Sequence, residues 1–267
     1  MVIITLTSDF GLFDPYVAEM KGVILSICPK VRIVDISHGV NKFDIHMGAF
    51  ILARTTPFFP AKTIHVAVVD PGVGSERRPI IIQTKRNIYV GPDNGILMLS
   101  AQREGIENIF VISNQRYMLS LSNTFHGRDI FSCAAAYLAN GIHPSEFGSE
   151  IGNPVPIIIQ KPILRDRFLI GEIIHVDNYG NLVTNILSDN VKKIVNGDLI
   201  VVFIKGKTFN LKVCASYSDV KYGRPLLIFG SSGHLEISIN RGNASNELGV
   251  KKGDSIQLIK TVEKMSY

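Results

Sequence analysis

Apolar and polar positions alternate along the first half of the chain in a way that predicts strands followed by helices. Apolar runs of strand length lie at Val2–Leu6, Val31–Ile36 and Thr63–Val69. The last run is nearly continuous in apolar residues, which is typical of a strand covered on both faces. Apolar residues recur at helical spacing after the first run and over Asp44–Arg54. The alternation predicts an α/β domain with a mostly parallel sheet.

Residues at the segment ends predict where the helices begin and end. We expect Asp14 to cap the first helix and Pro15 to open it, while Gly141 follows the last helical segment as a stop signal. The remaining elements expected in this half are strands at Ile80–Thr84, Asn87–Val90 and Asn108–Ser113 and helices at Ile96–Arg103 and Gly127–Asn140.

The pattern changes near residue 151. Pro154, Pro156 and Pro162 interrupt an extended stretch, which is typical of a linker or an edge strand. Strand-length runs separated by turns follow, and no long amphipathic helix is expected among them. We therefore expect an α/β domain over residues 1–155 and an all-β, barrel-like domain over residues 156–267. The expected strands are Phe168–Val176, Leu182–Ile186, Leu199–Ile204, Thr208–Val213, Leu226–Phe229, Leu235–Ile239 and Ser255–Ile259, with one turn at Asn196-Gly197-Asp198.

Composition excludes several classes of protein. The 267 residues are 46% hydrophobic and 19% charged, so the chain can bury a core and is not expected to be disordered. No apolar run reaches the roughly 18 residues of a membrane helix. The apolar start meets Asp9 early and no basic region precedes it, so we expect no signal peptide and a cytoplasmic protein. Cys28, Cys133 and Cys214 are far apart, and we expect them to be small buried residues.

The net charge changes this picture little. The 28 Lys+Arg exceed the 23 Asp+Glu by five, but the basic residues are scattered. The net charge is the only feature that would indicate a nucleic-acid binder, so we expect no nucleic-acid partner. None of the seven His pairs with another ligand at metal-binding spacing. We therefore expect no metal site.

Carboxylates follow the first three strands, at Asp9, Asp35 and Asp70. Ligands of open α/β sheets sit beyond the carboxyl ends of the strands, although a single Asp there is often only a cap or turn residue. Asp35 fits that simpler interpretation best. Asp70 is followed by a Pro-Gly-Val-Gly turn and then by Arg77 and Arg78, which are close enough to fold back over it. Such a pair is either a simple ion pair or, beside a pocket, a means to position and polarise a water.

Three further segments carry polar groups that suit a ligand. His126 precedes an expected helix, where an imidazole is either a packed neutral ring or a general base. Asp177-Asn178-Tyr179-Gly180-Asn181 combines an aromatic ring with amides, a familiar way to hold adenine. The segments from Ser231 to Glu236 and from Asn240 to Ala244 offer hydroxyls and backbone N–H groups for a carboxylate or a base edge.

Taken in order, these segments resemble the S-adenosylmethionine hydroxide adenosyltransferase family, relatives of the fluorinase and chlorinase enzymes. The resemblance implies an α/β domain and a barrel-like domain in a homotrimer, with the ligand between the first domain of one subunit and the second domain of the next. It also implies hydrolysis of S-adenosyl-L-methionine to adenosine and L-methionine, with no cofactor. The segments that carry it are Thr7 to Gly11 with Asp14, Asp35 to His38, Val69 to Gly74, Gly91 to Gly95, Phe125 to Asp129, Asp177 to Asn181 and Ser232 to Asn243.

The resemblance also assigns roles by position. Asp70, Arg77 and His126 match the family's water-activating set, with Arg77 chosen over Arg78 from its spacing to Asp70. Which of Asp70 and His126 takes the proton is left open by the sequence. The positions matched to substrate are Asp9 for the ribose diol, Phe43 for an aromatic contact, Asp14 and Asp177 for the ammonium, Ser231 and Ser232 for the carboxylate, and Tyr179, Asn181 and the backbone near Ala244 for adenine.

Two other functions remain as alternatives. The halogenating relatives carry a Tyr and a Thr where this chain has Asp70 and Val73, and a carboxylate repels a halide in a dry pocket, which favours water over chloride. A chlorinase thus remains only an alternative to hydrolysis. The second is a protein that binds S-adenosylmethionine or adenosine without turnover.

Overall fold

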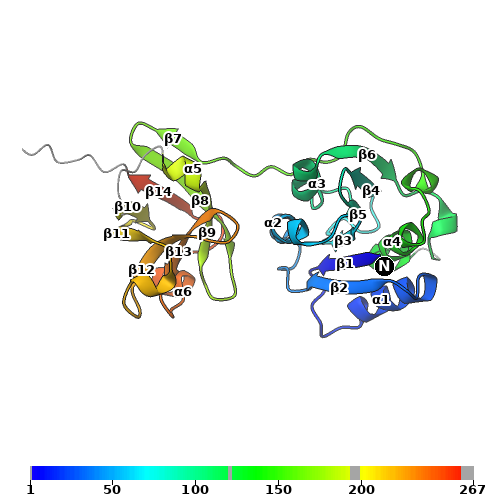
Figure 1. Cartoon of the computed structure of the whole chain (residues 1–267), viewed down its shortest axis with the longest axis horizontal. Helices are drawn as coiled ribbons and strands as arrows, with labels where there is room; N and C mark the ends of the chain where they lie inside the picture. Colours follow the sequence, from blue (N-terminus) through cyan, green and yellow to red (C-terminus); the bar gives the residue numbers. More distant parts are fainter. Residues whose placement is uncertain (1, 120–121, 193–198, 260–267) are drawn as a thin grey trace, which may run out of the picture. The chain divides into compact units, whose positions relative to one another are not determined.

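The computed structural model describes residues 2–119, 122–192 and 199–259, and the chain divides into two compact units, residues 1–157 and 158–267. The first unit contains a six-stranded sheet in the order β2-β1-β3-β5-β4-β6 (Figure 1). β2, β1, β3 and β5 run parallel, and only β4 is antiparallel to its two neighbours. The strands are β1 (Ile3–Ser8), β2 (Arg32–Ser37), β3 (Ile64–Val68), β4 (Pro79–Thr84), β5 (Ile88–Pro92) and β6 (Ile106–Val111).

Helices cover both faces of this sheet, as the apolar pattern predicts. Apolar residues of the first and fourth helices share one core cluster with β1 and β3, and those of the second and third helices form the other cluster. β3 is buried along its whole length, which agrees with its nearly continuous apolar sequence. The helices are α1 (Tyr16–Ile27), α2 (Ile45–Thr55), α3 (Met98–Glu104) and α4 (Cys133–Ala139), with short 3-10 turns at Thr56–Phe58, Gln115–Tyr117 and Pro144–Phe147.

Two expected helices begin differently from the prediction. Pro15 occupies the N-cap position of α1 and no side-chain cap hydrogen bond is formed there, so Asp14 lies one residue too early to cap the helix. The helix expected over Gly127–Asn140 begins instead as a π-helical turn over Gly127–Ser132, and only then continues as α4. Asp44 caps α2 as its position suggests, because its side chain accepts a hydrogen bond from the Met47 N–H at 2.9 Å.

The second unit is a closed barrel of seven strands, which confirms the expected barrel-like all-β fold. The hydrogen-bonded order is β14-β10-β11-β12-β13-β9-β8, and a β14–β8 pairing closes it while β7 adds to the outside edge of β8. β11 and β12 are parallel and the other neighbours are antiparallel. The strands are β7 (Ile163–Arg165), β8 (Phe168–Val176), β9 (Leu182–Leu187), β10 (Leu199–Ile204), β11 (Lys207–Cys214), β12 (Pro225–Phe229), β13 (His234–Ile239) and β14 (Ser255–Ile259).

Short elements in this unit were not expected from the sequence. They are β7, two single-turn helices α5 (Ser188–Val191) and α6 (Ala244–Leu248), and a 3-10 turn at Tyr217–Asp219. The turn expected at Asn196-Gly197-Asp198 lies outside the described residues. Within the described ranges, no helix is long and apolar enough to cross a membrane, and no three His, Cys, Asp or Glu side chains group to hold a metal ion. All three cysteines are buried, as expected, and none of them forms a disulfide bond in the described part of the chain.

Candidate functional site

A cavity of about 240 Å³ lies where β1 and β3 end. These strands are parallel neighbours, so Asp9 and Asp70, which follow them closely, reach the same edge of the sheet. Both carboxylates line the cavity together with His126. The sheet order therefore brings together three residues that lie up to 117 positions apart in the sequence (126 − 9).

Asp70, Arg77 and His126 form one hydrogen-bonded cluster at this edge. The Arg77 guanidinium donates from Nε to Asp70 Oδ1 at 3.1 Å and from Nη2 to Asp70 Oδ2 at 2.5 Å. The same Nη2 lies 2.7 Å from His126 Nδ1. The Asp70 and Arg77 side chains are 5% and 7% exposed. A bidentate ion pair this deeply buried has a fixed geometry, unlike a solvated surface pair.

Burial shifts the titration of the two acid–base groups in this cluster. Burial raises the pKa of the Asp70 carboxyl above its ordinary value of 3.8, and the Arg77 charge offsets this only in part. Burial and the Arg77 charge lower the pKa of His126 below 6.5, against the opposing charges of Asp70 and Asp129. The paired guanidinium of Arg77 favours the ionised form of Asp70, and the lowered pKa of His126 favours a neutral imidazole.

A close backbone approach joins the two loops that carry the cluster. Gly74 has φ +77°, and a Cβ at this position would overlap the Asn123 carbonyl oxygen. A glycine is required here because any side chain would push the loop of Asp70 and Arg77 away from the loop of His126.

The two consecutive arginines have different partners. Arg78 donates to Asp93 Oδ2 at 2.5 and 2.9 Å and to the backbone oxygen of Asn153 at 2.7 Å. Neither of these partners lines the cavity. Arg77 is thus the arginine that contacts Asp70 and His126, and Arg78 braces the segment that leaves the α/β unit.

Asp9 is buried at 6% exposure and lines the same cavity. Its Oδ2 accepts the Phe43 N–H at 2.9 Å, and its backbone oxygen accepts a hydrogen bond from Lys42 Nζ at 2.7 Å. Phe43 adopts φ +65°, a conformation that is unfavourable for a bulky residue, and its ring is 68% exposed at the cavity edge. Asp14 is exposed on the loop before α1 and does not line the cavity.

In the barrel unit, the Asp177–Asn181 loop is organised around its own carboxylate. Asp177 Oδ1 accepts the backbone N–H groups of Tyr179 and Asn181, each at 2.9 Å, and Asp177 Oδ2 accepts the Asn181 amide at 2.8 Å. The Tyr179 ring is 78% exposed. Asp177 and Asn181 therefore hold the loop so that it presents the Tyr179 ring to solvent, and their contacts with an ammonium or a base stay predictions.

The remaining barrel residues fall into two places. The Ser245 N–H donates to the Gly180 oxygen at 3.0 Å, which brings the start of α6 at Ala244 beside the Asp177–Asn181 loop. Ser231 and Ser232 lie in the β12–β13 turn, toward the other end of β9, because His234 pairs with Leu187 and Ile237 with Leu182. The Ser232 hydroxyl is buried and finds no hydrogen-bond partner within the described residues.

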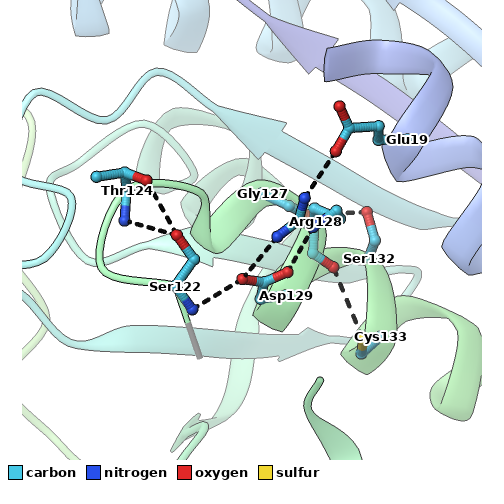
Figure 2. Close-up of polar contacts among 8 residues, drawn as sticks. All are labelled: Glu19, Ser122, Thr124, Gly127, Arg128, Asp129, Ser132 and Cys133. Atoms are coloured by element: carbon cyan, nitrogen blue, oxygen red, sulfur yellow. Dashed lines mark hydrogen bonds and ion pairs between the residues drawn. The ribbon is translucent and has the colours of Figure 1, made fainter. Parts of the chain in front are cut away.

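Several residues at the cavity carry no clear signal in the sequence. Lys42 contacts Asp9 from a loop between β2 and α2, and Phe10 and Phe125 pack edge to face at 5.7 Å along one wall. A lone lysine has no diagnostic spacing, and the two aromatics lie in segments that carry the resemblance without a role assigned to their rings, so the fold is what shows these contacts. Figure 2 shows that Arg128 and Asp129, next to His126, also form an ordered polar network.

The fold and site together define a class of two-unit proteins, in which an α/β unit with a buried Asp-Arg-His cluster precedes a seven-stranded barrel. Sequence models of the SAM hydroxide adenosyltransferase N-terminal and C-terminal domains match residues 4–148 and 171–257. The chain therefore belongs to the SAM hydroxide adenosyltransferase family, which confirms the resemblance found in the sequence.

Individual relatives match nearly the whole chain. The chain is 40% identical to the (R)-S-adenosyl-L-methionine hydrolase of Methanocaldococcus jannaschii, covering 96% of this chain and 95% of the relative. It is 27% identical to the fluorinase of an Actinoplanes species, covering 97% of each. The solved structure of an uncharacterised conserved protein from Thermotoga maritima is similar with a TM-score of 0.90 and 36% identity, covering 97% of this chain and 100% of that one.

Proposed function

We propose that this protein hydrolyses S-adenosyl-L-methionine to adenosine and L-methionine. The observation that carries the proposal is the buried Asp70–Arg77–His126 cluster beside a cavity that Asp9 also lines. The name of the Methanocaldococcus relative specifies the R epimer at sulfur, and we take that epimer as the substrate. The identity of 40% over nearly the full chain supports the same reaction here.

The reaction is an in-line displacement at the ribose C5′ carbon. A water oxygen forms a bond to C5′ while the C5′–sulfur bond breaks, and its electron pair neutralises the sulfonium as methionine leaves. One water proton goes to a base of the protein and then to solvent. Because a sulfonium is already a good leaving group, the protein must mainly align the water and remove competing solvent. The step requires no metal and no redox cofactor.

The hydrogen bonding of the cluster favours Asp70 as the group that takes the proton. A guanidinium only donates, so His126 Nδ1 accepts from Arg77 and the neutral imidazole carries its proton on Nε2. That tautomer offers a donor at its other nitrogen. Asp70 keeps lone pairs beyond those that Arg77 uses, and burial makes it a stronger base. His126 then orients the water while Asp70 accepts its proton.

Arg77 supplies positive charge near the nucleophile. Its Nη1 is buried and has no hydrogen-bond partner in the part of the chain that the structure describes. A buried donor without a partner costs about 1–3 kcal/mol, and a bound water would satisfy it. A positive charge beside a water lowers the pKa of that water, so Arg77 favours formation of the hydroxide-like nucleophile.

The substrate contacts follow the roles that the resemblance implies. In the α/β unit, Asp9 accepts hydrogen bonds from the ribose diol and Phe43 packs against the ligand, while Asp14 meets the ammonium. Both Asp9 and Phe43 line the cavity, which supports their assignment. Negative charge also suits a substrate that is cationic at sulfur.

In the barrel unit, Tyr179 packs on adenine, Asn181 and the backbone near Ala244 read the edge of the base, and Asp177 meets the ammonium. Ser231 and Ser232 are assigned the carboxylate by the resemblance alone, because they lie toward the other end of β9 from Asp177. The exposed Tyr179 ring supports its own role, because it gains a partner when a ligand binds.

The assembled unit that we propose is a cytoplasmic homotrimer, in which the α/β unit of one protomer and the barrel unit of the next share one substrate. Leu12 and Phe13 are 77% and 101% exposed between Asp9 and Asp14. Apolar side chains that are this exposed beside a binding site are typical of a surface that another chain covers, which supports assembly.

The test is incubation of the protein with S-adenosylmethionine in ¹⁸O-labelled water. Each sulfur epimer is tested separately, and the products are analysed by chromatography and mass spectrometry. We expect methionine and adenosine in equal amounts, with the label in the adenosine 5′-hydroxyl and faster turnover of the R epimer. Excess chloride is included in a parallel reaction. Unlabelled adenosine rules out attack at C5′ by water, and 5′-chloro-5′-deoxyadenosine identifies a chlorinase instead. Adenosine binding without methionine release identifies a binding protein.

A further inference from the structure

Asp129 is a buried carboxylate for which the proposed chemistry has no use. Its side chain is 1% exposed. Its Oδ1 accepts from Arg128 Nε at 2.6 Å, and its Oδ2 accepts the Ser122 N–H at 2.9 Å and Arg128 Nη2 at 3.3 Å (Figure 2). A buried charge is costly unless such donors compensate it. The ordered donors around Asp129 therefore define its position closely.

The Asp129 backbone adds two more connections to the same loop. Its N–H donates to the Phe125 oxygen at 3.1 Å, and its carbonyl accepts the Leu119 N–H at 3.0 Å. With the Ser122 N–H on its side chain, this one residue binds three points of the segment that leads to His126. His126 follows that segment directly and contacts Arg77 at 2.7 Å.

Arg128 fixes the outer side of Asp129. Its Nη1 donates to Glu19 of α1 at 2.7 Å, and its guanidinium lies 5.2 Å from the centre of the Phe125 ring, which lines the cavity. Hydrogen bonds to Asp129 and Glu19 raise the pKa of Arg128, so it stays charged. The Arg128 side chain is about one-third exposed, so substitutions are easier to accommodate there than at Asp129.

The π-helical turn sets these residues in register with His126. Over Gly127–Ser132 the backbone makes one wide turn, and the Ser132 hydroxyl bonds the Gly127 oxygen at 2.8 Å (Figure 2). Such turns occur mostly as single wide turns inserted in helices, frequently at functional sites. Here the wide turn follows His126 immediately and places Asp129 under the segment that precedes it.

We propose that Asp129, held by Arg128, is a positioning residue that fixes His126 against Arg77. The inference rests on the proposed hydrolysis and adds a residue that contacts neither substrate nor water. Its side chain acts through the hydrogen bonds with the Ser122 N–H and with Arg128, and its backbone bonds to Phe125 and Leu119 add to them. Loss of the side-chain contacts loosens the segment before His126 and lets the imidazole leave the geometry that orients the nucleophile.

The test compares Asp129→Asn with Asp93→Asn in the full-length protein. Asp93 is a matched control because its side chain, like that of Asp129, is 1% exposed and paired with an arginine, in this case Arg78. Asp93 does not line the cavity. We expect kcat of Asp129→Asn to fall about 10²-fold, the loss typical of a misplacement near 1 Å, with KM for S-adenosylmethionine changed less than about threefold. Asp93→Asn should keep kcat within about twofold of the unsubstituted protein.

A pH profile separates positioning from general loss of structure. His126 faces Asp70, Arg77 and Asp129; the charges of Asp70 and Asp129 raise its pKa, and burial and the Arg77 charge lower it. Removing the Asp129 charge lowers that pKa, so the acid limb of the kcat profile should move to lower pH in Asp129→Asn and stay in place in Asp93→Asn. A variant that is only less stable and keeps the Asp129 charge would lose amplitude without moving the limb.

Arg128→Lys decides the matter if Asp129→Asn does not fold. It keeps the positive charge and loses the fork on Asp129, so we expect an intermediate fall in kcat, while Glu19→Gln, which touches only the outer side of Arg128, stays near normal. The inference is overturned if Asp129→Asn keeps both the kcat and the acid limb of the unsubstituted protein. Where only Arg128→Lys folds, the same result in that variant overturns it. The proposed hydrolysis fails separately, when the unsubstituted protein releases no methionine.

Discussion

The α/β unit and the barrel unit hold their polar groups in opposite ways. In the α/β unit, Asp70, Arg77 and His126 bind one another and are largely withdrawn from solvent. In the barrel unit, Tyr179 is 78% exposed and Asp177 uses its oxygens to brace its own loop. The first arrangement is assembled before any ligand arrives, and the second offers surfaces that a ligand can complete.

The difference indicates a division of work. Charges that are fixed in a buried, low-dielectric place act strongly on a transition state and cost no rearrangement when the reaction occurs. Exposed rings and hydroxyls contribute binding energy that applies to the ground state and the transition state alike. Substitutions in the α/β cluster should therefore lower kcat, and those in the barrel should raise KM.

Asp70→Asn should have the largest effect. It removes the proposed proton acceptor and the charge that Arg77 pairs with, so we expect kcat to fall by about 10²–10⁴-fold with KM nearly unchanged. Methionine release under saturating S-adenosylmethionine measures it. Breaking a buried ion pair costs about 3–5 kcal/mol, so circular dichroism must first confirm that the variant is folded at the assay temperature.

Asp35→Asn is the matched control for this prediction. Asp35 lies at the end of the neighbouring strand β2, where it pairs with Lys21 at 2.6 Å and His38 at 3.2 Å, and its side chain is 37% exposed. We expect it to keep kcat within about twofold. Equal losses in both variants would show that any carboxylate on this edge matters, and the comparison between the units would lose its basis.

The second prediction concerns stability in acid. His65 of β3 is fully buried between Thr5, Tyr89 and Phe59, and burial lowers its pKa to about 3. The folded pKa is below that of the unfolded chain, 6.5, so the stabilising effect is complete above pH 6.5 and is lost as the pH falls toward 3. Between pH 6.5 and about pH 4 the α/β unit should lose about 3 kcal/mol from this one group.

Hydrogen exchange at a series of pH values measures this loss separately in each unit. His65→Phe, which fills a similar space without titrating, should flatten the acid dependence of the α/β unit and leave that of the barrel unchanged. An acid dependence that stays as steep in His65→Phe would assign it to other groups. The cluster at the cavity would then be a candidate, since its groups also titrate.

The sequence predicted the parts of this molecule that depend on local pattern. Apolar runs identified the strands, and the spacing from Asp70 to Arg77 indicated that the arginine could fold back over the carboxylate, as it does. The tight turn at Gly74 was signalled by its glycines. These features are encoded within a few residues, where steric limits and hydrogen bonding act directly.

Features that depend on long-range packing were not predicted. The sequence predicted an ordinary helix after His126, and the π-helical turn begins at Gly127, where a Cβ would lie 3.3 Å from the Phe10 side chain and 3.4 Å from that of Met20. Likewise, no sequence pattern shows that Lys42 contacts Asp9, or that the Asp177 carboxylate accepts hydrogen bonds from its own loop. Each depends on where the fold places residues that are distant or locally unconstrained.

Tyr179→Ala should have a smaller effect, confined to binding. Stacking of an aromatic ring on a base contributes about 1–3 kcal/mol, so we expect KM for S-adenosylmethionine to rise by about tenfold or more and kcat to stay within about twofold. Steady-state kinetics measures both. Tyr222, also in the barrel unit and 73% exposed, provides the control, because Tyr222→Ala removes a ring of similar exposure with no proposed ligand. A fall in kcat without a change in KM would contradict the division of work.

Ser232→Ala should have the smallest effect and the clearest sign. The Ser232 hydroxyl is buried and has no partner among the residues that the structure describes, so its removal should leave the melting temperature unchanged or slightly higher. If the hydroxyl binds the substrate carboxylate, KM rises by about fivefold, equivalent to about 1 kcal/mol.

Ser238 of β13 also has a buried hydroxyl without a partner in the described ranges, but it has no proposed ligand. Ser238→Ala should therefore match Ser232→Ala in stability and leave KM unchanged. An equal KM in the two variants would show that the Ser232 hydroxyl is buried without binding the substrate. The carboxylate would then have to bind elsewhere in the barrel.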